Sequence, residues 1–311
     1  MLASIPFPDI SPVLVALNIP MWKFNLGNSS FRLGGFELAI HWYSLAYIAG
    51  ILMASWLMRF VIRKTDLWPK RKPAFTEKNL DDLITWLIIG IIIGGRLGYV
   101  LFYKPLYYLE NPVAALRIFD GGMSFHGGFL GVLLAGILFC RKNHIPILPA
   151  ADVMAMSAPA GLLFGRLANF INAELWGRET LLPWGIIFPG YEAQSCSNAI
   201  AGLCARHPSQ LYEALGEGLI LGIILLYLMF RTSALHLTGL LTGVFAFGYG
   251  LTRFLVELVR QPDAHFQSLQ NPIGYALQLN HLGLTMGQIL SLPMLIIGLW
   301  LIIKARKPLI C

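Results

Sequence analysis

Apolar stretches long enough to cross a bilayer recur along the 311 residues, separated by short polar segments. One helical crossing needs about twenty mostly apolar residues. Stretches approaching that length lie at 38–61, 83–102, 122–140, 150–171, 208–230, 237–259 and 286–303, with no internal repeat among them. The pattern predicts an all-α polytopic membrane protein with about seven transmembrane helices, in a single integral membrane domain that spans residues 1–311.

The basic residues predict the orientation of these helices. Lys and Arg cluster at 59–78, after the first stretch, then at 141–144 and again at 304–307. Short cytoplasmic loops are enriched in Lys and Arg, so we expect the N-terminus outside and the C-terminus in the cytoplasm. Residues 1–37 and 174–207 are then predicted to be extracytoplasmic. The first of these segments is interrupted by prolines, which favours an irregular or interfacial structure.

Composition supports the membrane class and excludes others. The chain is 56% hydrophobic and only 13% charged, which is too apolar for an ordinary soluble domain of this length. Its net charge of +7 could suggest nucleic acid, but the basic residues flank apolar stretches, so no nucleic-acid partner is predicted. The four cysteines form no CxxC or Cys/His pattern, and no metal or cofactor is predicted. Cys196 and Cys204 could pair outside the membrane, although nothing in the sequence requires it.

Polar residues interrupt the end of the fourth apolar stretch. In helical projection Arg166, Asn169 and Glu174 fall within one arc, while Asn172 points away. A charge at membrane depth is costly and normally faces a bundle interior or a wet cavity, so this face is a candidate site. The alternative is that Arg166 extends to the membrane interface as an isolated helix-end arginine.

A second polar stripe follows the sixth stretch, where Tyr249, Arg253, Glu257 and Arg260 lie within about 80° of one another. Arg253 and Glu257 could simply neutralise each other as an (i, i+4) pair. The outer ends of the apolar stretches contain more arginines than glutamates. The arginines are Arg96, Arg166, Arg253 and Arg260, and the glutamates are Glu174 and Glu257. A surplus of guanidinium groups in a low dielectric predicts an anion site, and phosphate suits guanidinium forks best.

His126 lies inside the third stretch, between Gly121-Gly122 and Gly127-Gly128. The glycines would let a backbone or a substrate approach the imidazole closely. A lone histidine in a core is more often a packing residue than a base, but arginines are predicted at the same depth. His126 is therefore a candidate for acid–base chemistry.

Five motifs in this order resemble the prolipoprotein diacylglyceryl transferases, a family of bacterial inner-membrane enzymes. The motifs are GGRLGYVLFY at 94–103, DGGMSFHGG at 120–128, GRLANFINAELWGR at 165–178, RHPSQLYE at 206–213 and RFLVELVRQPD at 253–263. The resemblance runs from about 41 to 291 and departs from the family mainly in the first 35 residues and at 271–284. It implies a multi-pass protein of the bacterial cell inner membrane.

The resemblance also implies a reaction. Such enzymes transfer the diacylglyceryl group of phosphatidylglycerol to the lipobox cysteine of prolipoproteins, forming a thioether and releasing glycerol 1-phosphate. The implied partners are phosphatidylglycerol, lipobox-containing prolipoproteins and the bilayer. The implied catalytic residues are His126, Arg253 and Glu257, and the implied phosphatidylglycerol-binding residues are Tyr43, Arg166, Asn169, Glu174, Gly177 and Tyr249.

Two questions stay open at this point. The thiol could lose its proton to His126, or Arg166 and Arg253 could stabilise the thiolate without a base. The chain could also be a lipid or anion transporter, or a structural scaffold. A transporter would be expected to place polar groups in both leaflets, whereas these residues are predicted in the outer one.

Overall fold

The computed structural model describes residues 4–26, 29–33, 35–118, 121–196, 204–262, 266–268, 271–279 and 282–305. Helices lie at each predicted position. They are α1 (Trp42–Arg63), α2 (Glu77–Phe102), α4 (Phe125–Lys142), α5 (Ile147–Ile171), the composite of α7 (Ser209–Glu213), η5 (Ala214–Ile220) and α8 (Leu221–Arg231), α9 (Leu240–Val256) and α10 (Met286–Ala305). Within the described residues, five helices are long and apolar enough to cross a membrane, and α9 is a shorter apolar helix. The helical, multi-pass membrane class is confirmed.

Local chemistry sets where these helices begin. The Thr76 hydroxyl accepts the backbone N–H of Asn79 and starts α2 six positions before the predicted boundary. Gly121 and Gly122 adopt φ of +79° and +81°, so α4 begins later than expected, behind the cap Ser124. Short helices α3 (Pro105–Glu110) and η3 (Pro112–Leu116) lie between α2 and α4.

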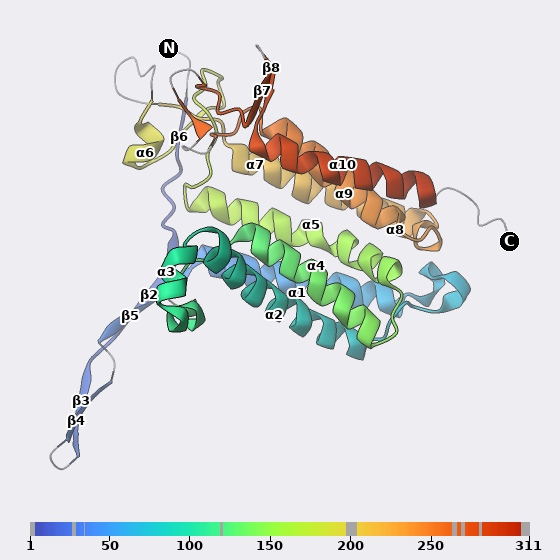
Figure 1. Cartoon of the computed structure of the whole chain (residues 1–311), viewed down its shortest axis with the longest axis horizontal. Coiled ribbons are helices and arrows are strands. Elements are labelled where there is room, and N and C mark those ends of the chain that lie inside the picture. The colour runs from blue at the N-terminus through green and yellow to red at the C-terminus, as the bar shows by residue number, and fades with distance from the viewer. Residues whose placement is uncertain are drawn as a thin grey trace.

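Helix α5 lies at the centre of the bundle (Figure 1). It packs against α1 on one side and against α7, η5, α8 and α9 on the other, while α2 pairs with α4 and α9 pairs with α10. Glycines allow the α2–α4 backbones to touch: a Cβ at Gly127 would lie 2.3 Å from the carbonyl oxygen of Gly94. The remaining short helices are η1 (Thr65–Leu67), η2 (Pro69–Arg71), α6 (Tyr191–Gln194) and η6 (Ala234–His236).

The prediction of an irregular N-terminal segment is wrong, because this segment forms strands. Strand β2 (Val13–Ile19) pairs antiparallel with β5 (Phe36–His41), and β3 (Trp22–Leu26) pairs with β4 (Ser29–Leu33). The ladder extends away from the bundle (Figure 1). Pairing satisfies the backbone groups of a Val- and Leu-rich run that has strand propensity, and it moves the start of the first helix from 38 to Trp42.

The N-terminus also packs on the excursion after α5. Strand β1 (Ile5–Pro6) pairs in parallel with β6 (Ile186–Ile187), and Phe7 lies against Phe170 and Phe188 with ring centroids 5.3 and 5.5 Å away. Cys196 and Cys204 form a disulfide in the same region. Strands β7 (Leu277–Leu279) and β8 (Leu282–Leu284) form a further small hairpin before α10. These segments cover one end of the bundle.

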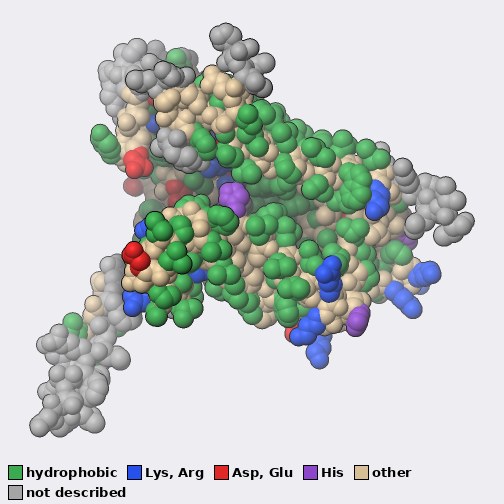
Figure 2. Space-filling view, viewed as in Figure 1, with side chains coloured by type: hydrophobic (Ala, Val, Ile, Leu, Met, Phe, Trp, Pro, Cys, Tyr) green, Lys and Arg blue, Asp and Glu red, His purple; other side chains and the backbone are tan. Residues whose placement is uncertain are grey.

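The two ends of the bundle differ in chemistry. The main apolar core contains Val61, Leu80, Val153, Leu225 and Leu241, each at most 1% exposed, and these residues lie in the half near the basic loops. Basic side chains gather at that end, where α1 and α4 finish (Figure 2). The half nearer the covered end instead buries arginines and glutamates, and the candidate site lies there.

Candidate functional site

The end of α5 supplies the first group of polar side chains. Asn169 Nδ2 donates to Glu174 Oε1 at 2.7 Å, as the shared-face prediction expected. Two details of that prediction are wrong. Glu174 lies beyond the helix, which ends at Ile171, and Asn172 does not point away, since its Nδ2 donates to the same carboxylate at 3.4 Å.

A strained turn brings Glu174 back onto the helix. Ala173 and Leu175, on either side of it, have φ of +52° and +57°, a region that non-glycine residues avoid. Tertiary hydrogen bonds hold this conformation: Ser209 Oγ donates to the Leu175 carbonyl at 2.8 Å, and Gln210 Nε2 donates to the Glu174 carbonyl. The surrounding structure therefore determines the position of the Glu174 carboxylate.

Arg166 lies one turn deeper and pairs with two glutamates from the neighbouring composite helix. Its Nε and Nη2 each donate to Glu217 Oε2 at 3.3 Å, and its Nη1 lies 2.9 Å from Glu213 Oε2. Arg166 is only 16% exposed, so it faces the bundle interior. The alternative that it merely extends to the membrane interface is excluded by this geometry.

Glu213 joins Arg166 to Arg253 on α9 and to Arg260, which follows the end of that helix. Arg253 Nη1 donates to Glu213 Oε1 at 2.6 Å, and Arg260 Nη1 donates to the same oxygen at 3.4 Å. Arg253 Nη2 also lies 3.0 Å from Glu257 Oε2, which confirms the expected (i, i+4) pair. The two residues do not simply neutralise each other, because Arg253 also contacts Glu213. Arg166 and Arg253 thus meet at one buried glutamate.

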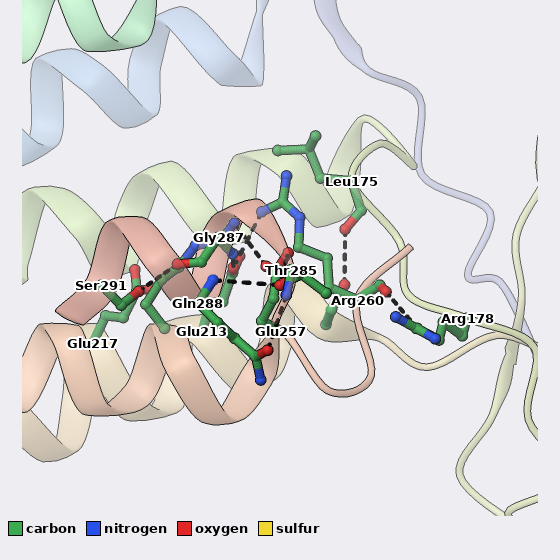
Figure 3. Close-up of polar contacts among 12 residues, drawn as sticks. Leu175, Arg178, Glu213, Glu217, Glu257, Arg260, Thr285, Gly287, Gln288 and Ser291 are labelled. Atoms are coloured by element: carbon green, nitrogen blue, oxygen red, sulfur yellow. Dashed lines mark hydrogen bonds and ion pairs between the residues drawn. The ribbon is translucent and has the colours of Figure 1, made fainter. Parts of the chain in front are cut away.

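We call these six residues the charged cluster: Arg166, Glu213, Glu217, Arg253, Glu257 and Arg260. Its acidic and basic members differ in exposure. The side chains of Glu213 and Glu217 are 1% and 0% exposed, whereas those of Arg166, Arg253 and Arg260 are 16%, 18% and 20% exposed. The two glutamates are therefore enclosed, whereas part of each arginine side chain remains accessible. Figure 3 shows Glu213 and Glu217 on the composite helix and Glu257 and Arg260 just after the end of α9.

The π-helical segment η5 places the two glutamates. It interrupts the composite helix between α7 and α8 and contains Glu217, and π-helical turns are frequent at functional sites. Close approach on both sides fixes it: a Cβ at Gly216 would lie 2.3 Å from Thr252 Cγ2 on α9, and one at Gly218 would lie 2.7 Å from Leu163 Cβ on α5. The segment is held between the two arginine-bearing helices.

The predicted surplus of positive charge is wrong in two respects. Glu213 and Glu217 add two carboxylates, so the charged cluster has three arginines and three glutamates. Arg96 does not join it. Its guanidinium donates to five backbone carbonyls between α2 and α4, those of Ala114, Ala115, Arg117, Gly121 and Gly122. Arg96 therefore holds together the loop that leads into α4.

The other predicted site residues lie around the charged cluster. Tyr249, one turn before Arg253, is within electrostatic range of Arg166 and Glu217. Tyr43 is within electrostatic range of Glu174 and Arg166, and its hydroxyl lies 2.8 Å from that of Tyr47.

Gly177 is a site of close backbone approach. A Cβ there would lie 2.5 Å from the Val259 carbonyl oxygen and 2.7 Å from His207 Cβ. Its N–H donates to the His207 carbonyl at 2.8 Å. A glycine is required because three backbone segments meet at this point.

His126 lies in the first turn of α4, behind the cap Ser124, and its side chain is exposed. The start of α4 and the end of α5 lie at the same end of the bundle (Figure 1). The structure thus places His126 at the same end as the charged cluster, on a helix that contributes none of its members. Within the described residues, no group of three or more His, Cys, Asp or Glu side chains is arranged to hold a metal ion.

Sequence reasoning missed Glu213, Glu217 and Asp152. Two carboxylates four positions apart within an apolar stretch were a readable signal for the first two. Asp152 is 1% exposed near the opposite end of α5 and accepts the N–H groups of Gly239 and Thr242 at 2.7 and 2.8 Å. It caps the start of α9 and is accounted for by that role.

Comparison with known proteins identifies the family of this chain. Residues 29–304 match the family described as prolipoprotein diacylglyceryl transferase. The chain is 54% identical to the phosphatidylglycerol–prolipoprotein diacylglyceryl transferase of Cereibacter sphaeroides over 306 residues, which is 98% of this chain and 99% of the relative. The relative from Roseobacter denitrificans is 51% identical with the same coverage, and that from Rhizobium leguminosarum bv. trifolii is 45% identical over 99% of this chain and 96% of its own length. The chain therefore belongs to the prolipoprotein diacylglyceryl transferase family.

Proposed function

We propose that this protein transfers the diacylglyceryl group of phosphatidylglycerol to the lipobox cysteine of prolipoproteins. The observation that carries the proposal is the charged cluster itself. Three partly exposed arginines pair with buried glutamates in a chain whose relatives are named for this transfer. The accessible guanidinium groups would bind the lipid phosphate, and the carboxylates beneath would keep them in place.

The reaction requires a thiolate and an anionic leaving group. The cysteine sulfur bonds to the glyceryl carbon, and the bond between that carbon and the phosphate oxygen breaks. The electron pair leaves with glycerol 1-phosphate, and a thioether remains on the prolipoprotein. Arg253 and Arg260 would stabilise charge on the departing phosphate, because desolvated, preoriented donors act strongly in such a site. Arg166 would hold the headgroup, with Asn169, Glu174, Gly177, Tyr43 and Tyr249 around it.

The thiol proton needs an acceptor, and His126 is the residue that we assign to this step. Its side chain is exposed, and the first turn of α4, which contains it, lies at the same end of the bundle as the end of α5. A neutral imidazole can accept a proton near neutral pH. If Arg166 and Arg253 stabilise the thiolate directly, His126 would instead position neighbouring groups.

We further propose that the charged cluster opens to the extracytoplasmic side of the bacterial inner membrane. The basic loops lie at the opposite end of the bundle, which the positive-inside rule places in the cytoplasm. The Cys196–Cys204 disulfide lies at the covered end, and disulfides persist in oxidising compartments. Residues 1–37 and 174–207 would then face that compartment, and all 311 residues would form one integral membrane domain of about seven spans.

Purified protein incubated with phosphatidylglycerol, labelled in its acyl chains, and a lipobox peptide tests the proposal. We expect a labelled, heavier peptide together with released glycerol 1-phosphate. Arg166→Ala should abolish this product. Gly165→Ala is the matched control, because a Cβ at the adjacent position meets nothing within 4 Å and should leave transfer intact. Movement of labelled lipid between leaflets without peptide modification would show a transporter, and no effect on either substrate would indicate a scaffold.

A further inference from the structure

The last helix, α10, contributes no arginine to the charged cluster, yet its first turn lies directly against it (Figure 3). Thr285 immediately precedes α10, and its hydroxyl donates to Glu257 Oε1 at 3.1 Å. Thr285, Gln288 and Glu257 are 4%, 4% and 7% exposed, so this contact is buried. Glu257, which caps the end of α9, therefore has a partner at the start of α10 as well as Arg253 on α9.

The start of α10 is fixed by reciprocal capping. Gln288 N–H donates to Thr285 Oγ1 at 3.3 Å, and Thr285 N–H donates to Gln288 Oε1 at 3.1 Å. This is a capping box, in which two N-terminal backbone donors are satisfied by side chains. The same Thr285 oxygen thus accepts from α10 and donates to Glu257, which ties the carboxylate to the helix start.

Gly287 forms the wall behind the Glu257 carboxylate. A Cβ at this position would lie 2.5 Å from Glu257 Cδ and 2.6 and 2.7 Å from its two oxygens. Favourable contacts between carbon atoms require about 3.5–4.0 Å, so a methyl group would displace the carboxylate by roughly an ångström. No backbone atom is among the three nearest atoms, and the flexible carboxylate can move aside without separating the helices.

We propose that Gly287 is a positioning residue for the transfer reaction, acting through Glu257 on Arg253. This inference rests on the proposed function. The absence of a side chain at 287 lets the carboxylate sit on the first turn of α10, 3.0 Å from the Arg253 guanidinium that also bonds Glu213. Moving the carboxylate would turn Arg253 away from the departing phosphate, with little effect on the packing of α9 on α10.

Gly298 provides the matched control, because it lies in the same α9–α10 contact but away from the charged cluster. A Cβ there would lie 2.5 Å from the Phe247 backbone nitrogen and 2.8 Å from the Gly243 carbonyl oxygen. Gly298→Ala must therefore separate the helices and lower the melting temperature. In Gly287→Ala the three atoms nearest the added methyl group all belong to the Glu257 carboxylate.

The experiment measures kcat and KM for phosphatidylglycerol, and the melting temperature in detergent, for the full-length wild type and each variant. Gly287→Ala should lower kcat by about 10- to 100-fold, since a misplacement near an ångström can cost about 10²-fold, with a melting temperature close to wild type. Gly298→Ala should lower the melting temperature, with a kcat close to that of the wild type in the protein that remains folded. An unchanged kcat for Gly287→Ala, or equal kcat losses in the two variants, would overturn the inference.

A double variant separates positioning from a general packing defect. Glu257→Asp retracts the carboxylate by one methylene and makes room for the methyl group of Gly287→Ala. The double variant should be more active than the product of the two single losses predicts, because both changes act through one contact. Multiplicative losses would overturn the proposal. Absence of transfer by the wild type would instead refute the proposed function, so the two failures are distinguishable.

Discussion

Glu213 should be the residue on which the geometry of the charged cluster depends most. Its carboxylate contacts Arg166, Arg253 and Arg260 at 2.9, 2.6 and 3.4 Å, and it is 1% exposed. Glu213→Gln keeps the shape but removes the charge. The amide can accept from one guanidinium through its oxygen, while its NH2 group would face another cation. Arg166 and Arg253 would then be left close together without their shared counter-charge.

The magnitude follows from these contacts. Removing one partner of a buried ion pair typically costs about 3–5 kcal/mol, and here three arginines share that partner. We expect a destabilisation in this range. A shift of an arginine by about an ångström should lower kcat/KM for phosphatidylglycerol by about 10²-fold or more in the protein that remains folded. Melting in detergent and lipobox-peptide transfer measure the two effects.

Asp152→Asn is the control variant that removes a buried carboxylate outside the charged cluster. Asp152 is also 1% exposed, but it lies near the opposite end of α5 and caps α9. The amide has one acceptor oxygen in place of two, so a buried donor of Gly239 or Thr242 loses its partner, and we expect a cost of about 1–3 kcal/mol of stability with the activity per folded molecule retained. The reasoning is refuted if Glu213→Gln melts like the wild type and transfers lipid at an unchanged rate, or if Asp152→Asn loses as much specific activity as Glu213→Gln.

Three further outcomes are expected. Arg166→Lys keeps the charge but cannot span Glu213 and Glu217 while binding phosphate, so kcat/KM should fall at least about tenfold; full turnover and lipid affinity would contradict the phosphate role. His126→Gln should lower turnover about 10²-fold or more with lipid binding intact and partial rescue by imidazole, whereas near-normal turnover at neutral pH would leave thiolate stabilisation to the arginines. Arg96→Lys should release the carbonyls of the loop before α4 and speed its hydrogen exchange; unchanged protection there would show that the five contacts do not hold the loop.

The sequence by itself determined the helices and identified several charges within apolar stretches. Apolar runs near 20 residues predict crossings because every backbone polar group in lipid must be satisfied within the segment. An ionised side chain at membrane depth is costly and needs a partner, so the sequence alone identified Arg166, Arg253 and Glu257 as candidate site residues. The Thr-x-x-Gln spacing at 285–288 was a readable capping box, although nothing in the sequence linked it to Glu257.

Only the tertiary structure decided which partner satisfies each charge. Arg96 and Arg166 gave the same signal in sequence, but Arg96 is enclosed by carbonyls and Arg166 lies against Glu213 and Glu217. Strand β1 likewise depends on a remote segment, because it pairs with β6. The physical reason is that ion pairing requires distances near 3 Å. Those distances are set by helix packing and by the π-helical turn of η5, which residue periodicity does not specify.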